Sequence, residues 1–207
     1  MRDNTFSFVV VEGVHGAGKT TVSEMLRDRF GAALLHFTPE FGRFRQDAEL
    51  DVKVAPLPRL LHYLAATMQV SDLAKAHLES RHVVCDRYLV SSLTLLASDP
   101  SVTAQEVATI VATYEPYYCS PDLTLLLTVE HSVATTRLRG RADRIVTNSQ
   151  RESTESPAFF QRWQLHMKKE VTRRGSYVEI DTSDLSRSEM LVCALDAVVD
   201  RLGLGER

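Results

Sequence analysis

The sequence predicts an α/β fold in which helices cover both faces of a parallel sheet. Strand-like apolar runs alternate with helix-like segments along the chain, and a glycine-rich turn follows the first run. The 207 residues are 44% hydrophobic and 25% charged, a balance typical of a soluble domain with a sizeable core. We therefore expect residues 1–207 to form a single domain.

The strand-like runs are short and rich in branched apolar residues, as strands buried on both faces of a sheet are. They cover Phe6–Val11, Ala33–Phe37, His82–Cys85, Leu123–Val129 and Tyr177–Ile180. Ligands of parallel sheets bind beyond the carboxyl ends of the strands. The residues that directly follow each run are therefore the first candidates for a functional site.

The segments between these runs carry helix signals. Apolar residues from Leu60 to Leu73 recur with the spacing of one helix face, and Thr103 with Glu106 forms the capping-box pattern of a helix start. The predicted helices are Thr20–Phe30, Pro58–Ser80, Thr103–Tyr114, Ser132–Arg139, Pro157–Arg173 and Arg187–Leu202.

The turn after the first run fits G-x-x-x-x-G-K-[ST], the pattern of a phosphate-binding loop. Its glycines let the backbone curl so that N–H groups point at phosphate oxygens, and the following helix turns its positive end toward the anion. Lys19 is expected to reach the β- and γ-phosphates and Thr20 to hold Mg²⁺. An ordinary glycine turn would not explain these two side chains. The predicted nucleotide-binding residues are Gly13, Val14, His15, Gly16, Ala17, Gly18, Lys19, Thr20 and Thr21.

Charged residues also follow the second and third runs. Asp86 and Arg87 come directly after the third, where the carboxylate could orient Mg²⁺ and the planar guanidinium could clamp a phosphate. Glu40 follows the second run, and a carboxylate there could accept a proton from a substrate hydroxyl. The alternatives are a surface ion pair for Asp86 and Arg87 and a solvated loop carboxylate for Glu40.

A polar, arginine-dense stretch lies late in the chain. Phosphoryl transfer spreads negative charge over the moving group, and a mobile arginine arm can stabilise that charge. A flexible lid would also exclude water from the reaction. We expect such a lid at about residues 139–155, with Arg137, Arg141 and Arg144 as catalytic candidates, although a solvated charged face would give the same composition.

Composition argues against several other classes. The formal net charge of −3 is unlike the basic excess of a dedicated nucleic-acid binder, and no apolar run approaches the length that spans a bilayer. The three cysteines form no C-x-x-C pair, which fits reduced thiols. We expect a cytoplasmic protein with no nucleic-acid partner and no membrane segment.

Together and in this order, the motifs resemble those of the thymidylate kinase family, within the wider group that includes deoxynucleoside kinases. The matching pieces are Val11–Thr21, Asp86-Arg87-Tyr88 with Ser91-Ser92, Pro121–Leu125 and Arg137–Ile145. The resemblance implies a P-loop NTPase-type five-stranded parallel sheet with an arginine-rich lid. It also implies ATP and Mg²⁺ as cosubstrates and a homodimer.

The chain departs from the family pattern near the acceptor. His15 stands where thymidylate kinases usually carry an acidic residue. Pro39 stands where they carry a phosphate-contacting arginine, a role that Arg43 or Arg45 could take over. On the second helix, Tyr63 and Thr67 occupy the positions of the base-stacking aromatic and of the arginine that reads thymine. The resemblance places Glu40, Arg43, Tyr63, Thr67, Gln69, Arg87 and Tyr88 beside the acceptor.

These observations favour ATP-dependent phosphoryl transfer to a nucleoside monophosphate, whose base the missing thymine contact leaves in doubt. Such an acceptor is largely dianionic at neutral pH and needs positive charge more than a base, since a phosphate's second pKa is about 6. The alternative is a (deoxy)nucleoside kinase, in which Glu40 would be the base for a 5′-hydroxyl. A catalytically inactive nucleotide-binding scaffold is the third hypothesis, although Lys19 and the arginines that it would be expected to lose are present.

Overall fold

The computed structural model describes residues 6–36, 56–96, 103–140 and 148–204. Within them, a five-stranded sheet has the strand order β2-β3-β1-β4-β5, and every neighbouring pair is parallel. The strands are β1 Phe8–Gly13, β2 Ala33–His36, β3 Val83–Asp86, β4 Leu123–Thr128 and β5 Tyr177–Asp181. This confirms the predicted α/β class and the five-stranded parallel core.

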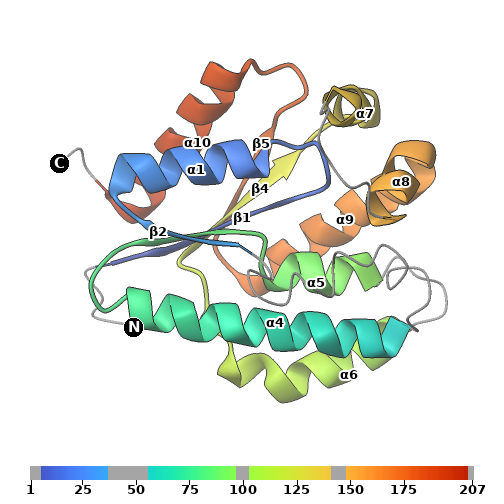
Figure 1. Cartoon of the computed structure of the whole chain (residues 1–207), viewed down its shortest axis with the longest axis horizontal. Coiled ribbons are helices and arrows are strands. Elements are labelled where there is room, and N and C mark those ends of the chain that lie inside the picture. Colours follow the sequence, from blue (N-terminus) through green and yellow to red (C-terminus); the bar gives the residue numbers. More distant parts are fainter. Residues whose placement is uncertain (1–5, 37–55, 97–102, 141–147, 205–207) are drawn as a thin grey trace.

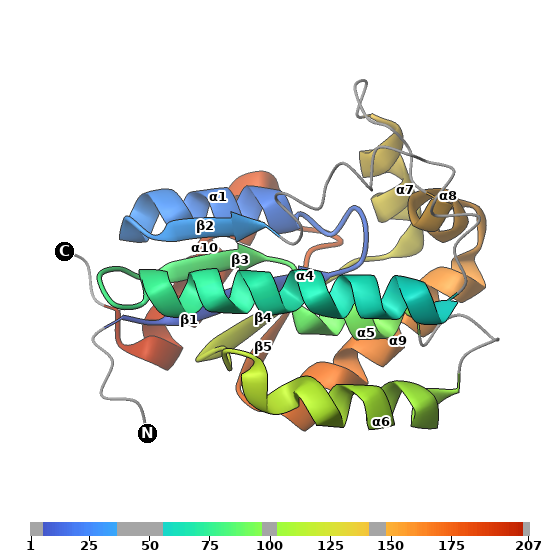
Figure 2. The ribbon, with the colours of Figure 1, turned by 60° about the horizontal axis from the view of Figure 1, so that its bottom comes forward.

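Helices cover both faces of the sheet (Figure 1). One face carries α1 (Lys19–Phe30) and α10 (Arg187–Leu202). The other carries α4 (Pro56–His77), α5 (Leu89–Leu96) and α9 (Pro157–Arg174). Figure 2 shows α6 (Ala104–Tyr114) with the short helix η1 (Glu115–Tyr117) outside that layer, and α7 (His131–Arg139) with α8 (Asn148–Glu155) grouped at one end of the molecule.

The described strands and helices agree with most predicted segments to within a few residues at their ends. The capping box at the start of α6 is present, because Thr103 Oγ1 accepts from Glu106 N and Thr103 N donates to the Glu106 carboxylate. Helix α5 was not predicted, since its eight residues are mostly apolar and lack a capping residue at their start. Its first turn is held by a side chain from β1, which no local pattern could indicate.

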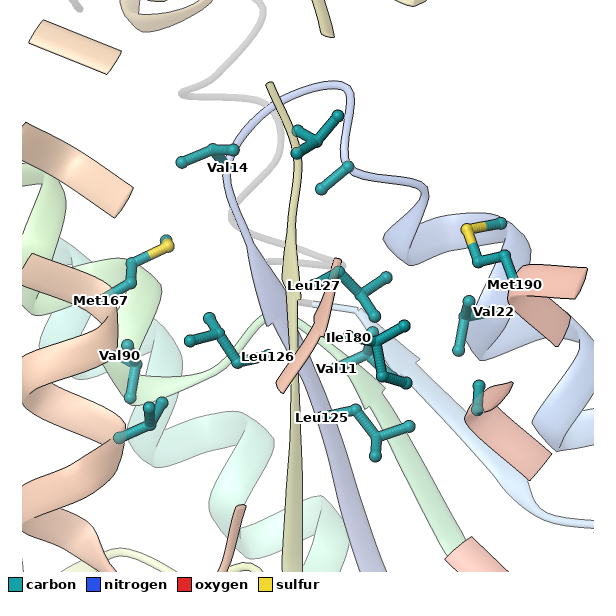
Figure 3. Close-up of a cluster of buried hydrophobic side chains, with 14 of the residues drawn as sticks. Val11, Val14, Val22, Val90, Leu125, Leu126, Leu127, Met167, Ile180 and Met190 are labelled. Carbon is teal, nitrogen blue, oxygen red and sulfur yellow. The ribbon is translucent and has the colours of Figure 1, made fainter. Parts of the chain in front are cut away.

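Buried side chains line both faces of the central strands. Leu125 and Leu127 of β4 lie on the side of α1 and α10, whereas Leu126 lies on the side of α5 and α9 (Figure 3). All three side chains are fully buried. The two packed layers fix the central strands, and the carboxyl ends of β1, β3 and β4 therefore meet at one edge of the sheet.

Two further features bear on the predicted cellular setting. Cys85 and Cys119 are buried and Cys193 is exposed, and these three residues, all within the described ranges, form no disulfide. Among the helices that the structure describes, none combines the length and the apolar character needed to cross a membrane.

Candidate functional site

The glycine-rich loop between β1 and α1 lies in close contact with α7 and α10. Gly16 and Gly18 have φ angles of 82° and 99°, in the left-handed region that favours glycine. A Cβ atom on Gly16 would lie 2.8 Å from the Ala134 carbonyl oxygen of α7, and one on Gly18 would lie 2.6 Å from Met190 Sδ of α10. The loop therefore keeps the curled backbone that fits a nucleotide's phosphates.

The first turn of α1 supplies two polar side chains beside this loop. Lys19 Nζ donates to the Val14 carbonyl oxygen at 2.7 Å, so the ammonium lies against the loop. Thr20 Oγ1 donates to Asp86 Oδ2 at 2.7 Å, whereas Asp86 Oδ1 is buried and has no hydrogen-bond partner within the described residues. A hydroxyl paired with a partly unsatisfied carboxylate fits a Mg²⁺ ion that takes its other ligands from phosphates and water.

A buried carboxylate joins this loop to the end of β3. Glu12 of β1 is fully buried and accepts hydrogen bonds from Tyr88 N at 2.9 Å, from Ser91 N at 3.1 Å and from the Ser91 hydroxyl. It therefore satisfies N–H groups at the start of α5 that have no partner within the helix. Burial raises the pKa of the Glu12 carboxyl, while the Ser91 hydrogen bond and the Arg87 charge act against this shift.

The Arg87 guanidinium lies directly beside the phosphate loop. Its Nη1 donates to the Gly13 carbonyl oxygen at 3.2 Å and to Ser91 Oγ at 3.1 Å, and its Nη2 lies 3.2 Å from His15 Nδ1. The guanidinium carbon is 5.9 Å from the ring centre of Trp163, within cation–π range. A guanidinium cation thus lies at the carboxyl ends of β1 and β3.

Arg137 of α7 contacts the loop from another side. Its guanidinium donates to Thr182 Oγ1 at 3.0 Å, to the Thr182 carbonyl oxygen at 2.6 Å and to the Gly16 carbonyl oxygen at 3.4 Å. Thr182 is fully buried, and its own hydroxyl lies 3.2 Å from the Ala17 carbonyl oxygen. Arg137, a predicted lid arginine, therefore binds the loop backbone in this structure, and its catalytic role stays a prediction.

Three predicted acceptor residues lie on α4. Thr67 is fully buried, and its hydroxyl donates to the Tyr63 carbonyl oxygen at 2.8 Å and lies 3.0 Å from Ser92 Oγ of α5. Thr67 therefore joins α4 to α5. Tyr63 is half-buried, and the buried Oε1 atom of Gln69 has no hydrogen-bond partner in the described part of the chain.

The Tyr88 side chain lies in the core and not beside the predicted acceptor site. Its ring packs edge-on against Phe8 and Tyr118, with ring centres 5.3 and 6.4 Å apart, and burial raises the pKa of its phenol. The physical reason lies in its neighbours, because the left-handed Arg87 (φ 72°) and the Glu12 bond to Tyr88 N turn the chain at this point. Tyr88 contributes to the site through its backbone.

Several candidates fall outside the described residues. These are Glu40, Arg43, Arg141 and Arg144. Of the expected lid at about residues 139–155, the structure describes the end of α7, Gly140 and the helix α8. The roles of these four residues and of the lid stay predictions.

Sequence reasoning missed four residues that shape the site, namely Glu12, Ser91, Trp163 and Thr182. Glu12 had a signal, since it is a single acid at the end of an apolar strand. Thr182 directly follows β5 and belongs to no recognisable motif in the sequence. Trp163 is buried, and its contacts with His15 and Arg87 come only from the tertiary structure.

The comparison with known protein families decides the relationship. The family described as thymidylate kinase matches residues 11–189. The chain belongs to the thymidylate kinase family. A probable thymidylate kinase of Methanococcus maripaludis (strain C7) is 25% identical over 198 residues, which cover 94% of this chain and 96% of that protein. Another from Methanocaldococcus jannaschii is 30% identical over 150 residues, which cover 67% and 72%.

Solved structures agree with this assignment at the level of the fold. Thymidylate kinase from Candida albicans superposes with a TM-score of 0.76 at 15% identity and covers 96% of this chain and 93% of its own. Deoxyadenosine kinase from M. mycoides with bound dATP gives a TM-score of 0.65 at 18% identity, with coverages of 92% and 98%. Family and fold together confirm the expectation of a nucleotide or nucleoside kinase.

Replacing Glu12 tests its role in joining β1 to α5. Glu12→Ala should lower the free energy of unfolding by about 3 kcal/mol or more, because buried donors that lose their acceptor cost roughly 1–3 kcal/mol each. Glu12→Gln keeps a carbonyl oxygen and should lose clearly less. Urea denaturation of both variants measures the difference, and equal losses would contradict the role.

Wild type and the Glu12→Gln variant also test the direction of the pKa shift of Glu12. A raised native pKa means that the folded state binds more protons than the unfolded state in the interval above the ordinary value of 4.5. The Glu12 contribution to stability should therefore fall as the pH rises through that interval. Glutamine does not titrate, so the stability of wild type relative to Glu12→Gln should decline over the same range.

Proposed function

We propose that the protein transfers the γ-phosphoryl group of ATP to a nucleoside monophosphate, with Mg²⁺ as cofactor. The observation that carries this proposal is the Arg87 guanidinium, which is held 3.2 Å from the Gly13 carbonyl oxygen beside the phosphate loop. A fixed cation at that point suits an acceptor that already bears a phosphate, since such a group is mostly dianionic above a pKa of about 6. A planar guanidinium can bind two phosphate oxygens at once.

The remaining site residues fit the two cosubstrates. When bound, ATP and Mg²⁺ supply the phosphoryl group and the charge that neutralises it during transfer. The loop backbone from Gly13 to Gly18 would bind the phosphates of ATP, and Lys19 would contact the β- and γ-phosphates. Thr20 and Asp86 would hold the metal. Because Asp86 Oδ2 already accepts from Thr20, its carboxylate suits a metal ligand better than a general base.

The acceptor's base is proposed to contact α4. Thr67 is committed to the packing between α4 and α5 and carries no guanidinium, so thymine would not be read there as the family pattern implies. Gln69 is the candidate to read a base edge, because its buried Oε1 atom has no hydrogen-bond partner among the described residues, and such an atom calls for an explanation. Tyr63 could stack on the base. By resemblance, Glu40 and Arg43 approach the acceptor, and Arg141 and Arg144 close over the phosphates from a lid.

An acceptor panel tests the reaction class. ADP release would be measured with ATP and Mg²⁺ against nucleosides and their monophosphates, dTMP included. We expect turnover with a monophosphate and none with nucleosides, and we expect dTMP not to be the best acceptor because the thymine-reading guanidinium is missing. Turnover with nucleosides alone would overturn the proposal and make Glu40 the expected base.

Replacing Lys19 separates a transferase from a scaffold. Lys19→Ala should lower kcat by roughly 10²–10³, the usual cost of losing a donor that stabilises developing charge. Lys169→Ala, an exposed lysine on α9, is the matched control and should keep the wild-type rate. A Lys19→Ala protein that binds ATP more weakly without any loss of turnover would contradict a catalytic role.

The protein is further proposed to form a homodimer and to work in the cytoplasm, where its three cysteines would stay reduced. The dimer is supported by α4, since Leu57, Leu61 and Ala65 are exposed at four-residue spacing and so share one helix face. Leu57 and Leu61 are 48% and 45% exposed, a large solvent-facing apolar area for adjacent turns of one helix.

Light scattering after size-exclusion chromatography tests the dimer. Wild type should have about twice the chain mass of 23.2 kDa. Leu61→Lys should produce monomers, because a charge would be buried without a partner in the interface. Val192→Lys, at an exposed apolar residue of α10, is the control and should remain dimeric. A monomeric wild type would exclude the homodimer.

A further inference from the structure

The backbone of Arg87 has an unusual conformation. Its φ angle of 72° lies in the left-handed region, which is uncommon for residues other than glycine. The residue is held there on both sides, because its N–H donates to the Val11 carbonyl oxygen at 3.0 Å and its carbonyl oxygen accepts from Cys85 Sγ at 2.9 Å. Such strain persists only where the surroundings enforce it, and it is typical of functional sites.

The Arg87 side chain is then directed by groups on three different elements. Gly13 lies at the end of β1, Ser91 lies on α5 and His15 lies in the phosphate loop. The Gly13 carbonyl and the Ser91 hydroxyl bind the same nitrogen, Nη1, whereas His15 contacts Nη2. His15 therefore adds a contact at the second terminal nitrogen, and together with the Nη1 contacts it restricts the orientation of the guanidinium plane.

The hydrogen bond with Arg87 determines which protonation state of His15 fits this contact. A guanidinium has donors and no acceptor, so His15 Nδ1 can contact Nη2 favourably only as an unprotonated acceptor. The ring is then neutral, with its proton on Nε2. An acidic side chain at this loop position would instead place a full negative charge beside Arg87, where it would compete with an anionic acceptor.

Trp163 packs against both the His15 ring and the Arg87 guanidinium. It is 1% exposed, and its Nε1 donates to Thr94 Oγ1 of α5 at 3.1 Å, so the indole cannot readily turn. The His15 ring meets the indole edge-on at 5.1 Å between ring centres, and the Arg87 guanidinium lies over the same indole. The tryptophan thereby limits the freedom of both members of the pair.

We propose that His15 is a positioning residue that aims Arg87 at the phosphate of the acceptor. His15 acts through a hydrogen bond from Arg87 Nη2 to the unprotonated Nδ1 of its neutral ring. The buried Trp163 limits the movement of both side chains. The proposal rests on the function proposed above, in which Arg87 binds that phosphate. It assigns His15 a role toward the acceptor in addition to the predicted contact of its loop with ATP.

A pair of His15 variants and a double-mutant cycle test this role. His15→Leu removes the acceptor atom and should lower kcat/KM for the acceptor by about tenfold to a hundredfold, the usual worth of a hydrogen bond to a charged group, with a smaller change in KM for ATP. His15→Asn offers an amide oxygen near the position of Nδ1 and should recover most of that loss. Leu165→Ala, at an exposed residue of α9, is the control for general damage.

The cycle adds Arg87→Lys, which keeps the charge and loses the planar fork. If His15 acts through Arg87, His15→Leu should change kcat/KM by less than about twofold in the Arg87→Lys background, because the interaction is already lost. The same fold-loss in both backgrounds would overturn the proposal. So would an asparagine variant no better than the leucine variant.

Spectroscopy tests the hydrogen bond between Arg87 and His15 without an activity assay. The chain has seven histidines, and the His15→Asn spectrum identifies the ¹⁵N signals of His15 by their absence. Wild type at neutral pH should show an unprotonated Nδ1, whose signal moves in Arg87→Lys. A proton on Nδ1, or a signal that Arg87→Lys leaves in place, would contradict the proposed hydrogen bond.

The two proposals fail in different ways. The acceptor panel decides the reaction class, and the cycle is then run with whichever acceptor wild type phosphorylates. Turnover of nucleosides alone, with intact coupling between His15 and Arg87, would overturn the proposed function and leave a positioning role toward a different acceptor. Turnover of a monophosphate without coupling would overturn the role of His15 alone.

Discussion

The buried Glu12 carboxylate is the interaction on which the rest of the site depends. It lies at the end of β1, directly before the phosphate loop, and binds the backbone of Tyr88 and Ser91 across the sheet edge. A buried charge is costly unless hydrogen bonds satisfy it, and here a hydroxyl and two N–H groups do so. One side chain thereby fixes the phosphate loop relative to the segment that carries Asp86 and Arg87.

A second set of hydrogen bonds, from Arg137 and Thr182, also holds the phosphate loop. Arg137 and the buried Thr182 bind carbonyl oxygens of Gly16 and Ala17, so the loop is tied to α7 and to the end of β5. A loop whose carbonyl groups are held in this way keeps its N–H groups directed to the opposite side, where the proposed function places the phosphates of ATP. Preorganised donors of this kind avoid reorganisation during the reaction.

Two cationic side chains contact the loop between β1 and α1. Lys19 lies against the loop backbone, and Arg87 lies beside it with its guanidinium held by neighbours on three elements. In the proposed function, the first would bind the phosphates of ATP and the second the phosphate of the acceptor. The presence of both cations beside one loop supports the proposed transfer between two phosphates.

The sequence by itself determined the fold class and the family, because these depend on local patterns and on motifs at strand ends; it also predicted that the glycine-rich loop binds phosphates and that Thr20 and Asp86 hold a metal ion. The tertiary structure alone decided that α5 is a helix, that Tyr88 lies in the core and that Arg137 braces the loop. It also brought His15, Arg87 and Trp163 together. Such contacts join residues more than seventy positions apart, and no local period or spacing encodes them.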